Sequence, residues 1–327
     1  MSSQTALNNA SAAVPMSKIV ALAGGVGGAK LAHGLYQALV PDALTVIVNT
    51  ADDFTYWGLR VSPDLDTVMY TLAGIANENT GWGVADETWS ALDAAGRLGG
   101  ETWFRIGDRD LATHVLRTEA LRAGKSLTAV TAEFAARLGI HGRLLPMTDA
   151  AVATMIETPD GWLAFQDYFV RRQHRDPVRA IRLDGIEQAE ATDDARQAIE
   201  SADLIIFCPS NPIVSIGPIL SLPGVQDLLK NHSVPRVAVS PIVGGKALRG
   251  PADTMLSALG HDSSALGVAR LYQDLLTGIV IDELDAEDAP AIRKLGMEVL
   301  VAGTVMRSIP DRRSLAERIL QWCARLR

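Results

Sequence analysis

The chain has 327 residues, of which 48% are hydrophobic and 21% charged, and its net charge is -8 at pH 7. This composition supports a large folded core and excludes an intrinsically disordered chain. The negative charge argues against a protein that mainly grips a nucleic-acid backbone, but it does not exclude small anionic ligands.

The termini and cysteines predict a soluble, cytoplasmic protein. No apolar run approaches the roughly 20 residues that a membrane span needs. Cys208 and Cys323 lie far apart and lack metal-binding spacing, so neither a disulfide framework nor a zinc site is expected. Residues 1–15 lack the features of a secretory signal and are interpreted as a flexible extension. Residues 16–327 are then expected to form a single domain.

The first predicted elements form a βαβ unit. The segment "SKIVALAGGVGGAKLAHGLYQALV" runs from an apolar stretch, residues 19–23, through four glycines into a helical pattern. A second apolar stretch, "ALTVIV", leads into Asp52 and Asp53. Ligands of such parallel sheets bind outside the carboxyl ends of the strands. The glycine turn and the two aspartates are therefore expected at one ligand-binding edge.

Further elements extend this pattern. Helices are predicted in "LDTVMYTLAGI", "GDRDLATHVLRTEALRAG", "SLTAVTAEFAARLGI" with Ser126 as N-cap, and "RRSLAERILQWCARL". Strands are predicted in "RLLPMTD", "ATMIET", "WLAFQDYFV" and "VRAIRLDG", and again in "ADLIIF", "RVAV", "LTGIVID" and "MEVLV". The predicted fold class is α/β: a Rossmann-like parallel sheet flanked by helices, with residues 81–190 interpreted as a smaller inserted α+β lobe.

The glycine turn predicts an anion-binding site. Gly25, Gly27 and Gly28 stand between a strand and a helix, where glycine lets backbone N–H groups approach a phosphate closely. The turn is not a Walker A loop, and Lys30 occupies the place of the third glycine in a dinucleotide fingerprint. A tight turn without a ligand is the alternative.

Four aspartates follow the second strand. Asp52, Asp53, Asp64 and Asp66 could hold a divalent cation, because Mg²⁺ prefers one or two carboxylates together with phosphate oxygens and water. Helix capping is the alternative, with Ser62 or Asp64 as N-cap and Asp66 in the first helical turn.

Two later loops are also suited to phosphate. "PSNPIVSIGP" places Ser210, Asn211 and Ser215 directly after an apolar strand. "SPIVGGKALRGPA" adds Lys246 and Arg249, whose charges could neutralise a diphosphate.

These segments together resemble one family. "GGVGGAKL", "VNTADD", "SPDLDTVMYTL", "GDRDLATH", "FQDYFV", "PSNPIVSIGPIL" and "SPIVGGKALRGPA", in this order, resemble the 2-phospho-L-lactate transferase (CofD) family over nearly the whole chain from Met16. The resemblance implies a Mg²⁺-dependent enzyme that joins a guanosine diphosphate-activated three-carbon acid to the deazaflavin Fo. It would release GMP and form coenzyme F(420)-0 or its dehydro form. The acid could be 2-phospholactate, phosphoenolpyruvate or 3-phosphoglycerate, and the residue that selects it is not identified.

The resemblance also implies roles for the candidate residues. Asp66 and Arg105 would contact Fo, and either Asp53 or Asp66 would be the catalytic base. Metal ligands would come from Asp52, Asp53 and Asp64. The phosphate and nucleotide site would comprise Gly25, Gly27, Gly28, Lys30, Ser210, Asn211, Ser215, Lys246 and Arg249.

Two rival functions are weighed against this one. A non-enzymatic nucleotide-binding regulator would use the glycine turn without an acceptor site, and a nicotinamide-dependent oxidoreductase would use an acid after the second strand to bind ribose. The expected partners are small-molecule substrates, with neither nucleic acid nor membrane. A homodimer is expected, with "LTGIVIDEL" and the C-terminal helix as candidate contact surfaces.

Overall fold

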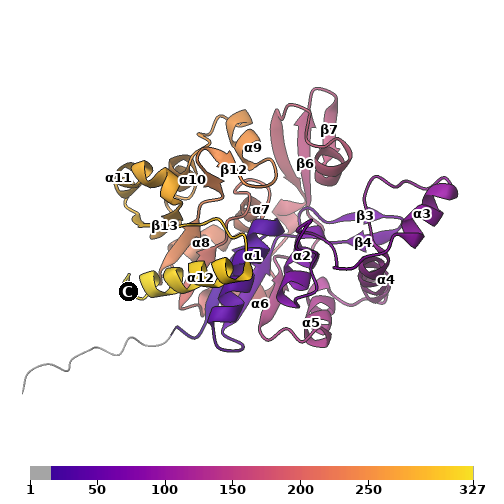
Figure 1. The fold of residues 1–327 in the computed structure, drawn as a ribbon, viewed down its shortest axis with the longest axis horizontal. Helices are drawn as coiled ribbons and strands as arrows, with labels where there is room; N and C mark the ends of the chain where they lie inside the picture. Colours follow the sequence, from indigo (N-terminus) through magenta and orange to yellow (C-terminus); the bar gives the residue numbers. More distant parts are fainter. Residues whose placement is uncertain (1–15, 327) are drawn as a thin grey trace, which may run out of the picture.

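A seven-stranded parallel sheet lies at the centre of the computed structural model, which describes residues 16–326 (Figure 1). Its strands in chain order are β1 (Ile19–Ala23), β2 (Leu44–Val48), β5 (Arg143–Pro146), β9 (Leu204–Phe207), β10 (Arg236–Val239), β13 (Gly278–Ile281) and β14 (Glu298–Val301). All neighbouring strands are parallel. The predicted Rossmann-like sheet is confirmed, while the predicted extension, residues 1–15, lies outside the described residues.

The strand order contains a topological switch point. The strands lie in the order β14-β13-β10-β9-β1-β2-β5, so the chain builds outward from β1 through β2 and β5 and then restarts on the other side with β9. In open α/β sheets the crevice at such a reversal, beyond the carboxyl ends of the strands, is where ligands bind. The segments that follow β1, β2 and β9 therefore define the place to look for a site.

Helices cover both faces of the sheet. One face packs against α1 (Gly25–Ala38), α2 (Pro63–Leu72), α5 (Leu127–Arg137) and α12 (Ile309–Cys323). The other packs against α6 (Asp193–Glu200), α7 (Ile216–Ser221), α8 (Val225–Lys230), α9 (Ala252–Ala258), α10 (Ala265–Leu271) and α11 (Ala289–Arg293). Successive side chains of β1 alternate between these two cores. Burial on both faces explains why β1 and β9 are entirely apolar.

Smaller elements surround the carboxyl edge of the sheet. They are the hairpin β3 (Phe54–Tyr56) and β4 (Leu59–Val61), the helices α3 (Ser90–Arg97) and α4 (Asp108–Arg122), the antiparallel sheet of β6 (Ala153–Thr158), β7 (Gly161–Ala164) and β8 (Ala180–Asp184), and the hairpin β11 (Ile242–Val243) and β12 (Lys246–Ala247). Residues 81–190 thus supply β5 to the main sheet as well as the three-stranded sheet.

One predicted strand is wrong in its second half. In "WLAFQDYFV" the strand β7 ends at Ala164, and residues 167–171 form a π-helical turn. Phe165 and Tyr168, three positions apart, both pack into the same apolar cluster as Ile156. That spacing suits a helical turn, whereas a strand would direct them to opposite faces.

Two local expectations about helices are settled. The Ser126 hydroxyl accepts a hydrogen bond from the Ala129 N–H at 3.1 Å, so the predicted cap of α5 is confirmed. None of the helices in the described part of the chain is long and apolar enough to cross a membrane.

The closest helix pair joins the two ends of the domain. The helix α1 packs against α12, and Figure 1 shows the two helices crossing. A Cβ atom at Gly34 of α1 would overlap the Arg312 carbonyl oxygen. Gly34 therefore sets how closely α12 can approach the helix that begins with the glycine turn.

We expect Gly34→Ala to lower the free energy of unfolding by about 1–3 kcal/mol, because the added methyl group would force the two helices apart. Urea unfolding followed by circular dichroism measures this. Gly303→Ala is the control, since a Cβ at that position has no atom within 4 Å. Equal unfolding midpoints for Gly34→Ala and the control would contradict the close-packing argument.

Candidate active site at the carboxyl edge of the sheet

The glycine turn after β1 is closed against the loop after β9. The Gly24 N–H donates to Ser210 Oγ at 3.1 Å, and the Ser210 hydroxyl donates to the Gly24 carbonyl oxygen at 2.7 Å. A Cβ at Gly27 would overlap the Pro209 carbonyl oxygen, and one at Gly28 would overlap Ser210 Oγ. The glycines are thus required for contact between the two loops. The Ser210 hydroxyl is engaged in that contact through its hydrogen bonds with Gly24.

The rest of the loop after β9 is held in place by its own side chains. Asn211 Oδ1 accepts hydrogen bonds from the backbone N–H groups of Ile213 and Val214, at 2.9 and 3.3 Å. Ser215 is buried beside the glycine turn. A Cβ atom added at Gly24 would lie 2.8 Å from the Ser215 Cβ. All three predicted nucleotide-site residues of this loop therefore lie at the switch point.

Asp64 links the acidic segment to the glycine turn. Its Oδ2 atom accepts a hydrogen bond from Asn49 Nδ2 at 3.0 Å, and its carboxylate also accepts one from the Gly25 N–H at the start of α1. The positive end of the α1 dipole favours a negative charge at this position. The glycine turn and the predicted metal-binding acids are thereby brought into direct contact.

Asp53 occupies a separate polar environment. Its Oδ2 atom accepts hydrogen bonds from the Ser62 hydroxyl at 2.7 Å and from Arg60 at 3.3 Å. Ser62 is the N-cap residue of α2, but its side chain makes no cap hydrogen bond. Ser62 therefore occupies the expected N-cap position, but its hydroxyl donates to Asp53 instead of capping the helix.

Burial raises the pKa values of the three acids, which we call the acidic cluster (Asp52, Asp53 and Asp64). Burial raises the pKa of Asp53 to about 7 despite its contact with Arg60. Burial also raises the pKa of Asp64 to about 6, although Asn49 lowers it. For Asp52, burial and then the Asp64 charge raise the pKa well above its usual range.

Several buried oxygen atoms around this cluster have no hydrogen-bond partner. They are Oδ1 of Asp52, Oδ1 of Asp53, and the hydroxyls of Thr50 and Thr154. Buried polar groups without protein partners are rare in folded proteins, and water, an ion or a ligand group can complete them. The donor set, carboxylate and hydroxyl oxygens, is the one that Mg²⁺ prefers. The cluster therefore fits a hard divalent cation.

A second buried charge cluster joins α2 to α4. Within residues 16–326, Asp66, Asp110 and His114 form the group whose metal-ligating atoms all lie within 4.8 Å of one another. Both carboxylate oxygens of Asp66 accept hydrogen bonds from the buried Arg117, one of them at 3.0 Å. Asp110 accepts a hydrogen bond from the Tyr70 hydroxyl at 2.7 Å.

The two clusters differ in what they can hold. The carboxylate oxygens of Asp52, Asp53 and Asp64 do not all lie within 4.8 Å of one another. Mg²⁺, however, needs only one or two protein carboxylates when phosphate and water supply the other ligands. Around Asp66 the negative charge is already compensated by Arg117, and that guanidinium would repel a cation. Charge balance also differs within the acidic cluster, where Asp53 pairs with Arg60 at 3.3 Å and no described ion pair involves Asp52 or Asp64.

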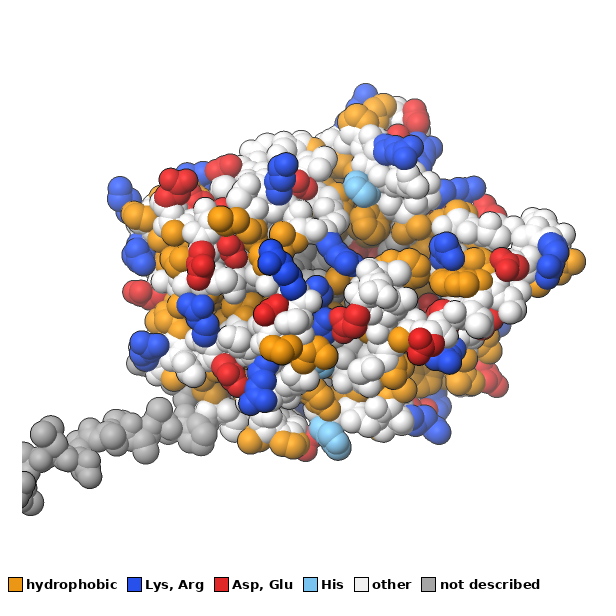
Figure 2. Space-filling model, viewed as in Figure 1, with side chains coloured by type: hydrophobic (Ala, Val, Ile, Leu, Met, Phe, Trp, Pro, Cys, Tyr) orange, Lys and Arg blue, Asp and Glu red, His pale blue; other side chains and the backbone are white. Residues whose placement is uncertain are grey.

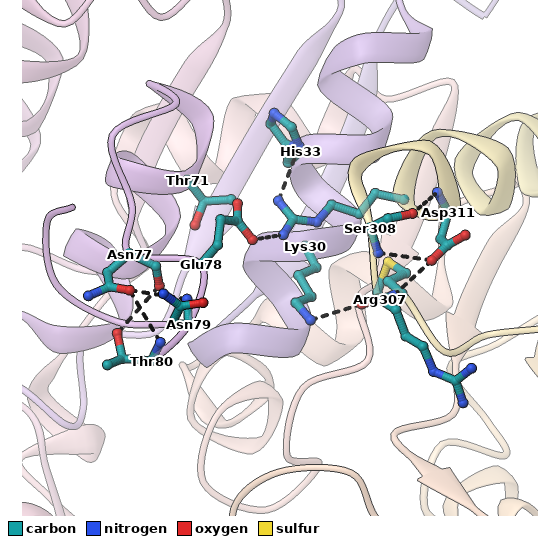
Figure 3. Close-up of polar contacts among 12 residues, drawn as sticks. Lys30, His33, Thr71, Asn77, Glu78, Asn79, Thr80, Arg307, Ser308 and Asp311 are labelled. Atoms are coloured by element: carbon teal, nitrogen blue, oxygen red, sulfur yellow. Dashed lines mark hydrogen bonds and ion pairs between the residues drawn. The ribbon is translucent and has the colours of Figure 1, made fainter. Parts of the chain in front are cut away.

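The predicted phosphate-binding cations occupy different positions. Lys30 Nζ donates to the Met306 carbonyl oxygen at 2.8 Å, and burial and the nearby Arg312 charge lower its pKa (Figure 3). Arg249 donates to the Thr80 carbonyl oxygen, while Lys246 is exposed on β12. Figure 2 shows Lys and Arg side chains gathered near the centre of the viewed face.

Arg105 lies with a tryptophan near the second cluster. Its guanidinium carbon sits 4.4 Å from the ring centroid of Trp89. A small cavity next to it is lined by residues that include Trp89, Glu87 and Asp110. Asp110 also belongs to the Asp66 cluster. Asp66 and Arg105, the two residues expected to contact Fo, therefore each have a neighbouring residue, Asp110 and Trp89, in the lining of this cavity.

Sequence reasoning missed several residues that hold the site together. Asn49 bonds Asp64, Arg117 binds Asp66, and Gln166 Nε2 donates to the Asp52 carbonyl oxygen at 3.3 Å. Only Asn49 had a usable signal, since it is polar and directly follows an apolar strand. Gln166 lies in the segment "FQDYFV", which supports the family resemblance but assigns no role to this residue. Arg117 lies far along the chain, with no local pattern to distinguish it.

Strand order and site together define a doubly wound α/β protein with a glycine turn and buried acids at its switch point. Residues 19–300 match the family described as 2-phospho-L-lactate transferase CofD. The chain belongs to this family of transferases.

Individual relatives agree with this assignment. The chain is 40% identical to a 2-phospho-L-lactate transferase of Methanosarcina mazei over 93% of its own length and 99% of the relative. It is 44% identical to a phosphoenolpyruvate transferase of Streptomyces griseus, over 95% and 99%. The crystal structure of a UPF0052-family protein from Bacillus halodurans matches with a TM-score of 0.63 at 15% identity, over 94% and 99% of the two chains, which confirms the fold.

Without divalent cations, we expect Asp53→Asn to become more stable relative to the wild type as the pH rises from 4.5 to 8. The pKa of Asp53 is raised from 3.8 to about 7 in the folded protein, so its contribution to stability is complete below pH about 4 and lost above 7. The melting-temperature gap between variant and wild type should widen across this range and correspond to more than about 1 kcal/mol at pH 8. Asp42→Asn, on the exposed surface, is the control. A gap independent of pH would contradict the raised pKa.

Proposed function

We propose that this transferase moves a phosphorylated three-carbon acid from its guanosine diphosphate conjugate to the ribityl hydroxyl of the deazaflavin Fo, in coenzyme F(420) biosynthesis, and releases GMP. The family and relatives named 2-phospho-L-lactate transferase and phosphoenolpyruvate transferase support this reaction. The observation that carries it is the contact of Asp64 with the Gly25 N–H, which joins an acidic cluster to an anion-binding turn. Either named acid, or 3-phosphoglycerate, is a candidate substrate.

Mg²⁺ would be held by Asp52 and Asp64, with Asp53 close by. When bound, the ion would neutralise charge on the diphosphate and its leaving group. The unpartnered Oδ1 atom of Asp52 supports this assignment. The carboxylates are tolerable beside a phosphate site only with such a counter-charge.

Binding of the donor would use backbone N–H groups and nearby cations. The N–H groups of the first turn of α1, which include that of Gly27, would bind phosphate oxygens, and Gly28 would let the phosphate approach closely. Asn211 and Ser215 would shape the nucleoside side, and Ser210 would fix the turn. Lys246 and Arg249 would supply positive charge from the β12 region, and Lys30 would do so from behind the turn.

Transfer would proceed by in-line attack of the Fo hydroxyl on the phosphorus next to the acid. The new O–P bond forms as the bond to GMP breaks, and GMP leaves with the electron pair. Asp53, with a pKa near 7 and a free Oδ1, is the better candidate to take the hydroxyl proton. Both oxygens of Asp66 are bound by Arg117, so Asp66 with Arg105 is assigned to holding Fo.

We also propose a cytoplasmic location and a homodimer, with small molecules as the only substrates. The C-terminal helix is the candidate dimer surface. The other predicted surface, "LTGIVIDEL", lies largely inside the sheet as β13, and only its end, at Glu283 and Leu284, is exposed. Analytical ultracentrifugation measures the oligomeric state.

The proposed reaction is tested with purified protein, Fo, Mg²⁺ and, in separate tubes, the three guanosine-linked acids. Chromatography should detect GMP and a new deazaflavin product in at least one tube, and EDTA should abolish both. Product in one tube identifies the acid. No product in any tube from folded protein that binds all its substrates would overturn the proposal.

Asp53→Asn should lower kcat by at least about 100-fold, because the variant cannot accept the hydroxyl proton. Steady-state kinetics with the active donor measure this. KM for Fo should change little, since Asp66 and Arg105 are intact. Asp42→Asn should keep wild-type kcat, and a similarly active Asp53→Asn would exclude Asp53 as the base.

A further inference from the structure

Asn49 occupies the junction of the three segments that form the site. It directly follows β2 and is completely buried. Its backbone N–H donates to the carbonyl oxygen of Ala23, the last residue of β1, at 3.1 Å. The side chain therefore starts at the carboxyl end of β2, beside β1 and next to the switch point.

The side-chain amide of Asn49 uses its full donor capacity on other segments. Nδ2 donates to Asp64 Oδ2 at 3.0 Å and to the Val214 carbonyl oxygen at 3.2 Å, while Oδ1 accepts from the Ala51 N–H at 3.0 Å. Acceptors on one side and a donor on the other fix the orientation of the amide. Asn49 thus connects the first turn of α2, the loop after β9 and the turn that carries Asp52.

We propose that Asn49 is a positioning residue that holds the Asp64 and Asp52 carboxylates in the arrangement that binds the divalent cation. This inference rests on the proposed metal site. Its assigned role is to orient Asp64, because both of its amide hydrogens are donated to protein acceptors and its oxygen accepts from the Ala51 N–H. It acts through Asp64, whose only other described partner is the Gly25 N–H.

No other side chain of this size meets the same requirements. Aspartate would place a further carboxylate oxygen against Asp64 and the Val214 carbonyl oxygen. Leucine would leave those acceptors and the Ala51 N–H without their partner, which is costly in a buried site. Partners that orient a metal ligand in this way typically change metal affinity 10- to 100-fold when removed.

The test measures Mn²⁺ binding to the metal-free full-length protein in the absence of substrates. Electron paramagnetic resonance of the free ion reports how much Mn²⁺ is bound. Asn49→Ala should weaken Mn²⁺ binding by about 10-fold or more. The affinity for Fo, measured by fluorescence, should be unchanged. In the transfer assay the variant should need more Mg²⁺ but approach wild-type kcat at saturation. If Asn49→Ala does not fold, Asn49→Ser serves instead, because it fills part of the space and keeps one donor.

Asp282→Ala is the matched control. Asp282 also follows a core strand, β13, and accepts hydrogen bonds from the Leu284 N–H, the Thr304 N–H and the Thr304 hydroxyl. Its loss should lower the melting temperature without weakening Mn²⁺ binding.

The outcomes separate this inference from the proposed reaction. Mn²⁺ affinity within twofold of wild type in the Asn49 variant, or an equal loss in Asp282→Ala, overturns the positioning role even if transfer occurs. Wild-type protein that binds no Mn²⁺ also overturns it. Selective loss in the Asn49 variant supports it, even when no transfer is detected and the proposed reaction fails.

Discussion

Burial of negative charge beside the glycine turn is the constraint on which this structure depends. Asp52, Asp53 and Asp64 lie together at the carboxyl edge of the sheet, and burial raises the pKa of each. Such groups are stable only where donors or cations compensate them. The chain supplies these donors from distant segments, and the remaining unpartnered oxygens are where a bound cation would add its charge.

The backbone and side chains of the segment between β2 and α2 are held from two opposite sides. On one side the three-stranded sheet contributes Gln166, which bonds the Asp52 carbonyl oxygen, and Thr154, whose N–H donates to the Ala51 carbonyl oxygen at 2.7 Å. On the other side α4 contributes Arg117, which binds both oxygens of Asp66. The small sheet and α4 are therefore supports for the site, and a site held by such supports keeps its geometry.

This arrangement suits transfer of a phosphorylated group. Such reactions need alignment and neutralisation of charge more than a covalent intermediate with the protein. The packing of Gly27 and Gly28 against the loop after β9 holds the anion-binding turn in place, and Asp64 ties it to the acids.

The sequence by itself determined the sheet, most helices and the family. Apolar strands buried on both faces, the glycine turn and the Ser126 cap depend on neighbouring residues, so they could be read from local patterns. Only the tertiary structure decided which partner each aspartate has. In the structure the Ser62 hydroxyl bonds Asp53 and not the backbone of its helix. Likewise "FQDYFV" forms a helical turn where the sequence predicted a strand, because Phe165 and Tyr168 both pack into one apolar cluster. The pairing of Asp66 with Arg117, 51 positions away, and the four contacts of Asn49 arise because the fold brings remote segments together, and no local pattern records that distance.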